Sequence, residues 1–307
     1  MDVAPHNVTN KLYGAIEAGG SKWLCAVGTG PDDLRVARFQ TRTPTETLSE
    51  VIDFFRQEQI KNPLEAIGIG SFGPLDLDKR SKTYGYITGT PKENWSHTDI
   101  VSPILQVLQV PVSFDTDVNT AALGEHIWGA AQGLSDFIYL TIGTGIGGGG
   151  LANGQLMHGL VHPEMGHIML PQMPEDDYVG GCAFHQNRCF EGLASGPSMT
   201  ARWHALAETF PEDHPAWTLE AHYIALALVS YICTLSPQRI ILGGGVMQQK
   251  QLFPLIRKNV KQLLNGYVQS SVMLTLNDYV VPPQLGDKAG LLGALALAKQ
   301  CRNVTHS

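Results

Sequence analysis

Glu17-Ala18-Gly19-Gly20-Ser21-Lys22 joins two strand-like runs, and this stretch decides how the fold begins. The run Leu12-Tyr13-Gly14-Ala15-Ile16 precedes it, and the run Trp23-Leu24-Cys25-Ala26-Val27 follows it. A short turn that contains glycine between two apolar runs is typical of a β-hairpin. The sequence therefore predicts that a β-hairpin opens the fold.

Beyond this hairpin, helical and strand-like patterns alternate along the chain. Helical spacing of apolar residues covers 47–57, 99–108, 120–128, 219–233, 252–264 and 288–299. Strand-like runs cover 66–70, 83–90, 110–114, 137–142, 149–151 and 239–242. This alternation predicts an α/β fold. The strand pair around the glycine-rich turn after 142 is similar to the opening hairpin, so we expect two similar halves.

The length of the chain, 307 residues, exceeds what one hydrophobic core usually supports, so we expect two lobes. We place a smaller N-terminal lobe at 1–115, which a returning C-terminal helix at 288–307 completes. The larger lobe, at 116–287, contains a loop with several cysteine and histidine residues.

Composition narrows the class of protein. The net charge is -7, without a basic stripe, which argues against a nucleic-acid surface. No apolar run approaches the roughly 18 residues of a membrane span, and no secretory signal opens the chain. Three of the five cysteines lie isolated in apolar stretches, so no disulfide framework is implied. We therefore expect a cytoplasmic protein that acts on a small molecule.

A group of metal-type ligands stands in the larger lobe. Cys182, His185 and Cys189 follow His167, and zinc prefers four such nitrogen and sulfur ligands in a tetrahedron. Four protein ligands leave no position for a reacting water, so the ion would be structural. Two free cysteines and two solvated histidines are the alternative. Because 171–190 shows almost no apolar periodicity, the loop needs another source of order, and this favours zinc.

Three glycine turns each follow a strand-like run, and they contain Gly19-Gly20-Ser21-Lys22, Gly143-Thr144-Gly145 and Gly243-Gly244-Gly245. Glycines let backbone N–H groups approach an anion closely, so each turn is a candidate phosphate site. The spacing matches neither a Walker loop nor a dinucleotide-binding turn. A hairpin turn without any ligand is the alternative.

Asp117 stands where a strand-like run gives way to a helical pattern. A carboxylate at such a junction can accept a proton from a hydroxyl within roughly 2.6–3.2 Å. Aspartate is also a preferred helix N-cap. The local sequence favours the cap without excluding the base.

These motifs occur together in the order seen in one family. The chain resembles the ROK family of sugar kinases and repressors along nearly its whole length, and the His-Cys-His-Cys loop with Thr90-Pro91-Lys92 and Trp95 resembles the zinc-containing bacterial fructokinase branch. The motifs that carry the resemblance are 17–22, 117–119, 143–149, 164–167, the Cys/His loop and 243–246.

The resemblance implies a two-lobed actin-like ATPase (ribonuclease H-like) fold of ROK type, with ATP between the glycine turns. It implies that Asp117 is the general base, in place of the local preference for a cap. It also implies sugar contacts from Glu164, His167 and Glu191, so that His167 serves zinc and sugar through different ring nitrogens. The residues implied to bind the nucleotide are Gly19, Gly20, Ser21, Lys22, Thr144, Gly145, Gly243, Gly244 and Gly245.

Three positions depart from the family pattern. Glu17 stands where the family usually has aspartate, which puts a water-mediated Mg²⁺ contact in question. Thr116 stands where asparagine is usual, so a sugar contact at this position would come from a hydroxyl and the hexose preference is open. His185 replaces a cysteine, and zinc accepts that change readily.

The function that the resemblance implies is phosphorylation of a hexose by ATP with Mg²⁺, with D-fructose and its 6-hydroxyl as the expected acceptor. Mannose or glucose is the alternative substrate, and a sugar-sensing regulator without catalysis is the alternative class. Only about eleven residues precede the first strand, too few for a DNA-binding helix-turn-helix. The family also implies a homodimer, with no nucleic-acid or membrane partner.

Overall fold

The structure is a computed structural model that describes residues 11–301, and it divides into two compact units. Unit 1 runs as far as Gly124 and resumes at Gly290, whereas unit 2 spans Glu125–Ala289. Each unit contains one five-stranded sheet and its own hydrophobic core.

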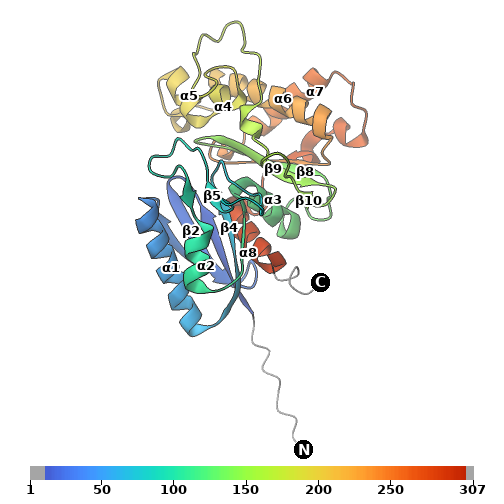
Figure 1. Ribbon diagram of the computed structural model, residues 1–307. Helices are drawn as coiled ribbons and strands as arrows, with labels where there is room; N and C mark the ends of the chain where they lie inside the picture. Colours follow the sequence, from blue (N-terminus) through green and yellow to red (C-terminus); the bar gives the residue numbers. More distant parts are fainter. Residues whose placement is uncertain (1–10, 302–307) are drawn as a thin grey trace, which may run out of the picture. The chain divides into compact units, whose positions relative to one another are not determined.

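The sheet of unit 1 has the strand order β3-β2-β1-β4-β7 (Figure 1). Its strands are β1 (Leu12–Ala18), β2 (Lys22–Gly28), β3 (Arg35–Gln40), β4 (Leu64–Ser71) and β7 (Val112–Thr116). Strands β1 and β2 pair antiparallel, which confirms the predicted hairpin. Strand β3 was not predicted from the sequence, because it is an edge strand that alternates exposed with half-buried residues and has no apolar run.

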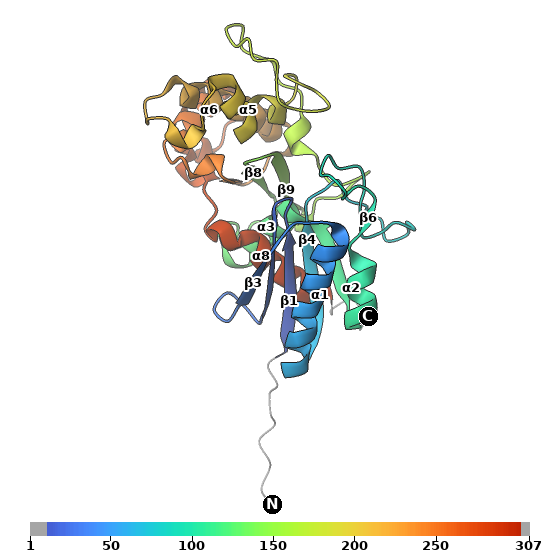
Figure 2. The same ribbon diagram turned by 90° about the vertical axis from the view of Figure 1, so that its left-hand side faces the viewer.

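Helices pack on both faces of this sheet (Figure 2). Helices α1 (Pro44–Lys61) and α2 (Val101–Leu108) contact each other on one face, while α3 (Asp117–Trp128) and α8 (Ala289–Cys301) lie on the other. A Cβ atom on Gly68 would lie 1.9 Å from the Ala294 carbonyl oxygen, and one on Gly70 would lie 2.1 Å from Thr120 Oγ1. Gly68 therefore lets the backbone of α8 approach the sheet closely, and Gly70 makes room for the Thr120 side chain of α3.

The boundary between the units lies inside α3, after Gly124. The boundary predicted from the sequence is 115/116, where strand β7 was expected to end. The first turns of α3 group with unit 1 because Thr120 packs against Gly70, and its carbonyl oxygen would lie 1.5 Å from a Cβ on Gly293.

The segment between β4 and α2 forms a small separate sheet. It contains β5 (Tyr86–Ile87) and β6 (Thr98–Asp99). The predicted strand at 83–90 is therefore too long. The observed strand β5 covers two residues and pairs with β6, which also has two residues. Trp95 anchors the segment: its ring is buried, lies 5.5 Å from that of Trp23, and donates from Nε1 to the Arg42 carbonyl oxygen.

The sheet of unit 2 repeats the pairing pattern of unit 1. Its strands are β8 (Phe137–Ile142), β9 (Ile146–Ala152), β10 (Gln155–Leu156), β11 (Ile240–Gly243) and β12 (Val280–Val281), in the order β10-β9-β8-β11-β12. In both sheets three strands pair antiparallel and two more continue in parallel. The expected similarity of two halves is confirmed at the level of topology.

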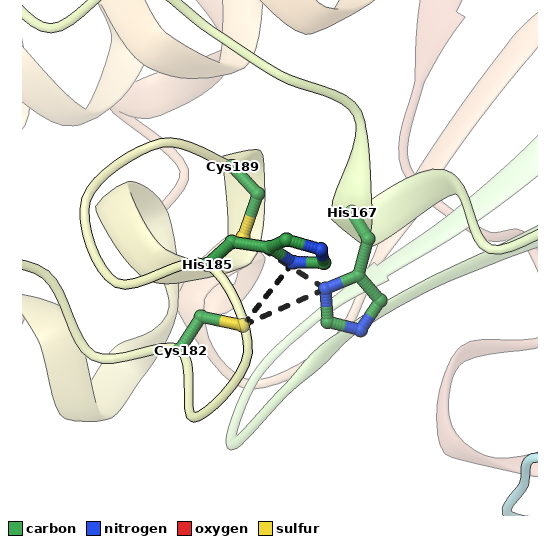
Figure 3. A group of neighbouring side chains, drawn as sticks. All are labelled: His167, Cys182, His185 and Cys189. Atoms are coloured by element: carbon green, nitrogen blue, oxygen red, sulfur yellow. Dashed lines mark hydrogen bonds between the residues drawn. The ribbon is translucent and has the colours of Figure 1, made fainter.

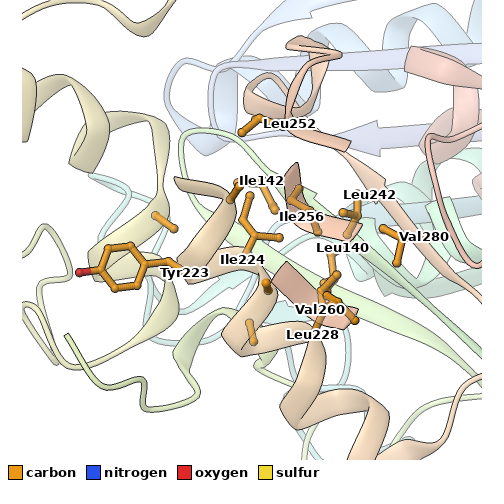
Figure 4. Close-up of a cluster of buried hydrophobic side chains, with 14 of the residues drawn as sticks. Leu140, Ile142, Tyr223, Ile224, Leu228, Leu242, Leu252, Ile256, Val260 and Val280 are labelled. Carbon is orange, nitrogen blue, oxygen red and sulfur yellow. The ribbon is translucent and has the colours of Figure 1, made fainter. Parts of the chain in front are cut away.

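The helices of unit 2 are α4 (Phe190–Ala194), α5 (Gly196–Trp203), α6 (Pro215–Leu235) and α7 (Leu252–Leu264). Short 3₁₀ turns are η1 (Met165–His167), η2 (Ala207–Thr209), η3 (Val246–Gln248), η4 (Ser271–Leu274), η5 (Leu276–Asp278) and η6 (Gly286–Lys288). Figure 4 shows Ile224 and Leu228 of α6 beside Leu140 of β8 and Ile256 of α7 in the core.

Helix α6 is long and apolar enough to cross a membrane by length and composition, the one such helix among residues 11–301. The expectation that no apolar stretch approaches that length is therefore wrong. Half of its most apolar window is buried inside unit 2, where α6 packs against α7, as expected for the central helix of a core.

Candidate functional site

Asp117 is the first residue of α3, directly after β7. Its Oδ1 accepts a hydrogen bond from the neighbouring Val118 N–H at 2.8 Å. The bond typical of an N-cap belongs instead to Thr116, whose Oγ1 accepts from the Asn119 N–H at 3.1 Å. The interpretation of Asp117 as the helix cap is therefore wrong. Asp117 is only partly buried, whereas Thr116 is buried.

A buried polar pair lies beneath this junction. Asp115 Oδ1 accepts from the Thr116 N–H at 2.7 Å and from Asn119 Nδ2 at 2.8 Å. Both side chains are buried, so these hydrogen bonds fix the backbone on either side of Asp117. Neither residue was predicted from the sequence to have a role. The polar run from 115 to 119 at the end of an apolar strand is the signal that could have indicated one.

The turn between β1 and β2 is fixed by Thr41. Its Oγ1 donates to the Gly19 carbonyl oxygen at 2.7 Å, and its N–H donates to the Ser21 carbonyl oxygen. A Cβ atom at position 19 would lie 2.8 Å from the Lys22 carbonyl oxygen, so glycine is required there. Ser21 and Lys22 are exposed, and a Cβ at Gly20 would meet nothing within 4 Å. The turn can thus approach a phosphate closely.

Unit 1 therefore brings its predicted residues to one edge of its sheet. Strands β1, β4 and β7 run parallel, and the register aligns Ala18 with Ser71 and Ser71 with Thr116. The turn that begins after Ala18 and the base candidate after Thr116 consequently share the carboxyl edge of these strands. Crevices at such edges are the usual ligand sites of α/β sheets.

Two glycine turns of unit 2 touch each other. The turn after β8 contains Thr144, which is exposed, and a Cβ on Gly143 would lie 3.6 Å from the Gly245 nitrogen in the turn after β11. Gly244 has φ 91°, and a Cβ there would lie 2.4 Å from the Ile142 carbonyl oxygen. Only glycine fits that position.

Glu191 is held against the first of these turns. Its Oε2 accepts from the Ile146 N–H at 2.9 Å, and a Cβ on Gly145 would lie 2.9 Å from the same oxygen. The backbone of Gly196 also donates to the Gly143 carbonyl oxygen at 2.8 Å. A carboxylate predicted to hold sugar hydroxyls is therefore built onto a turn predicted to hold phosphate.

Glu164 lies exposed at the start of η1, and its Oε1 is 3.5 Å from His162 Nδ1. The turn itself is pressed against β9, since a Cβ on Gly166 would lie 1.9 Å from the Ile146 carbonyl oxygen. The hydroxyl of Tyr231 donates to the Met165 carbonyl oxygen. These contacts hold Glu164 and His167 on a rigid turn.

The four metal-type ligands converge on one point (Figure 3). Cys182 Sγ lies 3.7 Å from His167 Nδ1 and 3.6 Å from His185 Nδ1, and Cys189 Sγ lies 3.8 Å from His167 Nδ1. All four ligand atoms lie within 4.8 Å of one another. A tetrahedral zinc ion bound to sulfur at about 2.3 Å and nitrogen at about 2.0 Å would separate its ligand atoms by about 3.3–3.8 Å. The residues fit zinc.

Cys189 also begins helix α4, where its Sγ accepts from the Gly192 N–H at 3.4 Å. Burial raises the pKa of its thiol to about 11. A zinc ligand must be a thiolate, so the ion would supply the positive charge that this buried sulfur needs.

The loop that carries the ligands has a second anchor. Asp176 accepts from Arg202 Nε at 3.0 Å and from the Tyr223 hydroxyl at 2.6 Å, and both charged side chains are almost fully buried. The Arg202 guanidinium lies 4.6 Å from the centre of the Tyr178 ring. The expectation that little besides metal orders 171–190 is therefore wrong, because these polar contacts leave no trace in apolar periodicity.

Comparison with known proteins identifies close relatives over almost the whole length. Residues 13–301 match the model of the ROK family. A protein of Bacillus subtilis (strain 168) is 50% identical over 292 residues, which is 94% of this chain and 96% of that protein. The fructokinase of Pediococcus pentosaceus is 42% identical over 290 residues, 94% of this chain and 98% of its own. The fructokinase of Zymomonas mobilis subsp. mobilis is 42% identical over 299 residues, 95% of this chain and 98% of its own.

Solved structures share the fold. A ROK hexokinase from Thermus thermophilus superposes with a TM-score of 0.77 at 24% identity, over 96% of this chain and 100% of that one. A ROK family glucokinase from Streptomyces griseus, in complex with glucose and AMPPNP, gives a TM-score of 0.73 at 26% identity. The match covers 94% of this chain and 99% of the glucokinase chain. The predicted fold class, the actin-like ATPase fold of ROK type, is confirmed.

Proposed function

The chain belongs to the ROK family, and we propose that it is an ATP-dependent fructokinase that converts D-fructose and ATP to D-fructose 6-phosphate and ADP. The observation that carries the proposal is the 42% identity to two fructokinases over 94–95% of the chain. The fold supports the same reaction class, since the glucokinase of similar structure was solved with a sugar and an ATP analogue.

Asp117 is the proposed general base. Its carboxylate takes the proton from the 6-hydroxyl of fructose while that oxygen attacks the γ-phosphorus of ATP. Its place supports this role, because Thr116 supplies the helix cap and the buried Asp115–Asn119 pair fixes the backbone around it. Phosphoryl transfer depends mainly on position and charge, so a rigid junction is what the reaction requires.

The glycine turns are the proposed phosphate and nucleoside contacts. In unit 1 these are Gly19, Gly20, Ser21 and Lys22, and in unit 2 they are Thr144, Gly145, Gly243, Gly244 and Gly245. Their backbone N–H groups approach phosphate oxygens without side-chain obstruction. Mg²⁺, when bound with ATP, would neutralise phosphate charge, and Glu17 at the carboxyl end of β1 is the acidic residue proposed to contact it.

Glu164, His167 and Glu191 are the proposed sugar contacts of unit 2. His167 turns Nδ1 toward the Cys/His cluster, which leaves Nε2 for a sugar hydroxyl. The predicted sugar contact of Thr116 is the weakest of the set, because its hydroxyl accepts at the helix start and its side chain is buried. Zinc is structural in this proposal: it fixes the turn that presents His167 and the helix that presents Glu191.

The test of the function is a coupled assay of ADP release with fructose, mannose and glucose, each at several concentrations. The expected result is sugar-dependent ADP release with the highest kcat/KM for fructose. Preference for mannose or glucose would assign another hexose. No sugar-dependent ADP from any of the three would overturn the kinase proposal and leave a sugar-sensing role.

We also propose that the enzyme is a cytoplasmic homodimer. ATP is a cytoplasmic substrate, and all five cysteines are free thiols, as is usual in a reducing compartment. Light scattering coupled to size-exclusion chromatography tests the dimer, with twice the chain mass of 33.3 kDa as the expected value. A monomer mass at assay concentrations would overturn it.

A further inference from the structure

Glu17 is one methylene longer than the aspartate expected at its position, and the structure shows where that methylene goes. Glu17 lies in β1 opposite Gly70 of β4, on the face of the sheet that α8 covers. A Cβ atom built on Gly290 of α8 would lie 3.2 Å from Glu17 Cγ, 2.8 Å from Cδ and 2.9 Å from Oε2. The side chain of Glu17 therefore occupies the space that any other residue at 290 would fill.

A glycine in this place has a cost. Gly290 is the second residue of α8, and glycine has a lower helix propensity than alanine. One turn further along, Gly293 is required by the backbone, since a Cβ there would lie 1.5 Å from the Thr120 carbonyl oxygen. At Gly290 the three nearest atoms all belong to the Glu17 side chain. The closest obstacle to a larger residue at 290 is therefore a side chain and not the backbone.

We propose that Gly290 is a positioning residue that gives the longer carboxylate of Glu17 its place in Mg²⁺ and phosphate binding. This inference rests on the proposed kinase function. Glu17 Oε2 is buried beside the start of α8, where the positive end of the helix dipole favours a carboxylate. The carboxylate of Glu17 would then lie at the carboxyl end of β1, where we propose that Mg²⁺ binds.

A substitution at Gly290 is expected to change Mg²⁺ binding without preventing folding. A Cβ at 290 would meet the far end of a flexible side chain, which can rotate away, and not the backbone. Gly290→Ala should therefore fold normally while the carboxylate of Glu17 moves. In the Glu17→Asp background the longer arm is absent, so the added methyl has much less to displace.

The test is a double-mutant cycle of Gly290→Ala, Glu17→Asp and the double variant. The free Mg²⁺ concentration for half-maximal turnover should rise about tenfold to a hundredfold in Gly290→Ala, as is usual when a residue that orients a metal ligand is lost. KM for fructose and the melting temperature should stay near wild type. In the Glu17→Asp background, Gly290→Ala should change the Mg²⁺ requirement by less than about twofold, because neighbouring sites couple.

Binding of Mn²⁺ to the enzyme–ADP complex, followed by electron paramagnetic resonance, measures the same effect without turnover. Gly30→Ala is the matched control, since a Cβ at Gly30 would meet nothing within 4 Å. Gly293→Ala, on the same helix, should lower the melting temperature because the added methyl group would clash with the backbone of Thr120.

Three outcomes would overturn the positioning role. Gly290→Ala could raise the Mg²⁺ requirement equally in the wild-type and Glu17→Asp backgrounds, it could leave the Mg²⁺ and Mn²⁺ dependence unchanged, or it could unfold the protein. Failure of the proposed function would look different, because wild type itself would then release no sugar-dependent ADP. If wild type releases sugar-dependent ADP and Gly290→Ala has the same Mg²⁺ requirement as wild type, only the positioning role is rejected.

Discussion

At the scale of single residues, the chemistry depends on which side chain performs which of two competing tasks at one junction. Thr116 and Asp117 could each cap α3, and the cap falls to Thr116. The carboxylate that follows, that of Asp117, is the proposed base. Neither residue type by itself specifies that the hydroxyl caps the helix and the carboxylate does not.

Asp117→Asn should lower kcat by at least about a hundredfold, because it removes the proton acceptor and keeps the shape. The binding constant for ADP and the melting temperature should be unchanged, since Asn preserves the contact with the Val118 N–H. Steady-state kinetics and calorimetric titration measure both. Activity within a few-fold of wild type would remove Asp117 from the role of base.

Asn119→Ala should behave differently, because it leaves the buried Asp115 carboxylate without the Nδ2 donor. We expect a loss of about 1–3 kcal/mol in the free energy of unfolding, as for other buried polar groups that lose a partner. The value of kcat should fall while KM for ATP stays constant. Urea unfolding with kinetics measures the pair of effects, and unchanged stability would contradict the positioning role of Asn119.

At the scale of elements, two groups of side chains with different chemistry hold the loop of 168–190. One is the Cys/His cluster, and the other is the buried ion pair of Asp176 with Arg202. The cluster lies beside the proposed sugar residues, and the ion pair ties the loop to α5 and the core helix α6. Loss of each should therefore have different consequences for substrate binding.

Cys189→Ser should release zinc, raise KM for fructose and lower the melting temperature, because this residue is both a proposed zinc ligand and the N-cap of α4. Elemental analysis of the wild type should give one zinc per chain. The control is Cys233→Ser, which changes an exposed thiol on α6. A wild type free of zinc would remove the basis of this prediction.

Acid should weaken the second anchor. Burial raises the pKa of Asp176, but hydrogen bonds from Tyr223 and Arg202 outweigh it and lower that pKa overall. A lowered folded-state pKa stabilises the protein above the ordinary aspartate pKa of about 4, and this contribution disappears as pH falls below it. The free energy of unfolding of Asp176→Asn should therefore depend less on pH between about 2 and 5 than that of wild type. Parallel curves would contradict the assignment.

At the scale of the whole molecule, two units share one strand topology but contribute different chemistry. Unit 1 supplies the proposed base and Glu17, and unit 2 supplies the proposed sugar carboxylates and the Cys/His cluster proposed to bind zinc. The chain passes between the units inside α3 and again before Gly290. The repeated topology therefore does not mean repeated function.

Removal of zinc should affect the two units unequally. After chelation, hydrogen exchange should become faster at 165–192 and at the turn around Gly145, because Glu191 binds the Ile146 N–H directly. The hairpin of β1 and β2, in the core of unit 1, should exchange as before. Mass spectrometry of peptides measures this pattern, and equal acceleration in both units would contradict it.

The sequence by itself determined the features that depend on local pattern. Apolar periodicity located most helices and strands, and ligand type and spacing brought Cys182, His185 and Cys189 together with His167. These predictions succeed because each depends on residues close in the chain or on chemistry with few alternatives, such as tetrahedral zinc ligands.

Only the tertiary structure decided the features that depend on contacts between distant segments. The assignment of the cap to Thr116, the anchor of Asp176 on Arg202 and the space for Glu17 at Gly290 all depend on which elements pack together. A pattern along one segment does not contain the position of its packing partner. The physical reason is that burial, backbone approach and polar pairing are fixed by the fold as a whole, whereas propensity is fixed by neighbours in the chain.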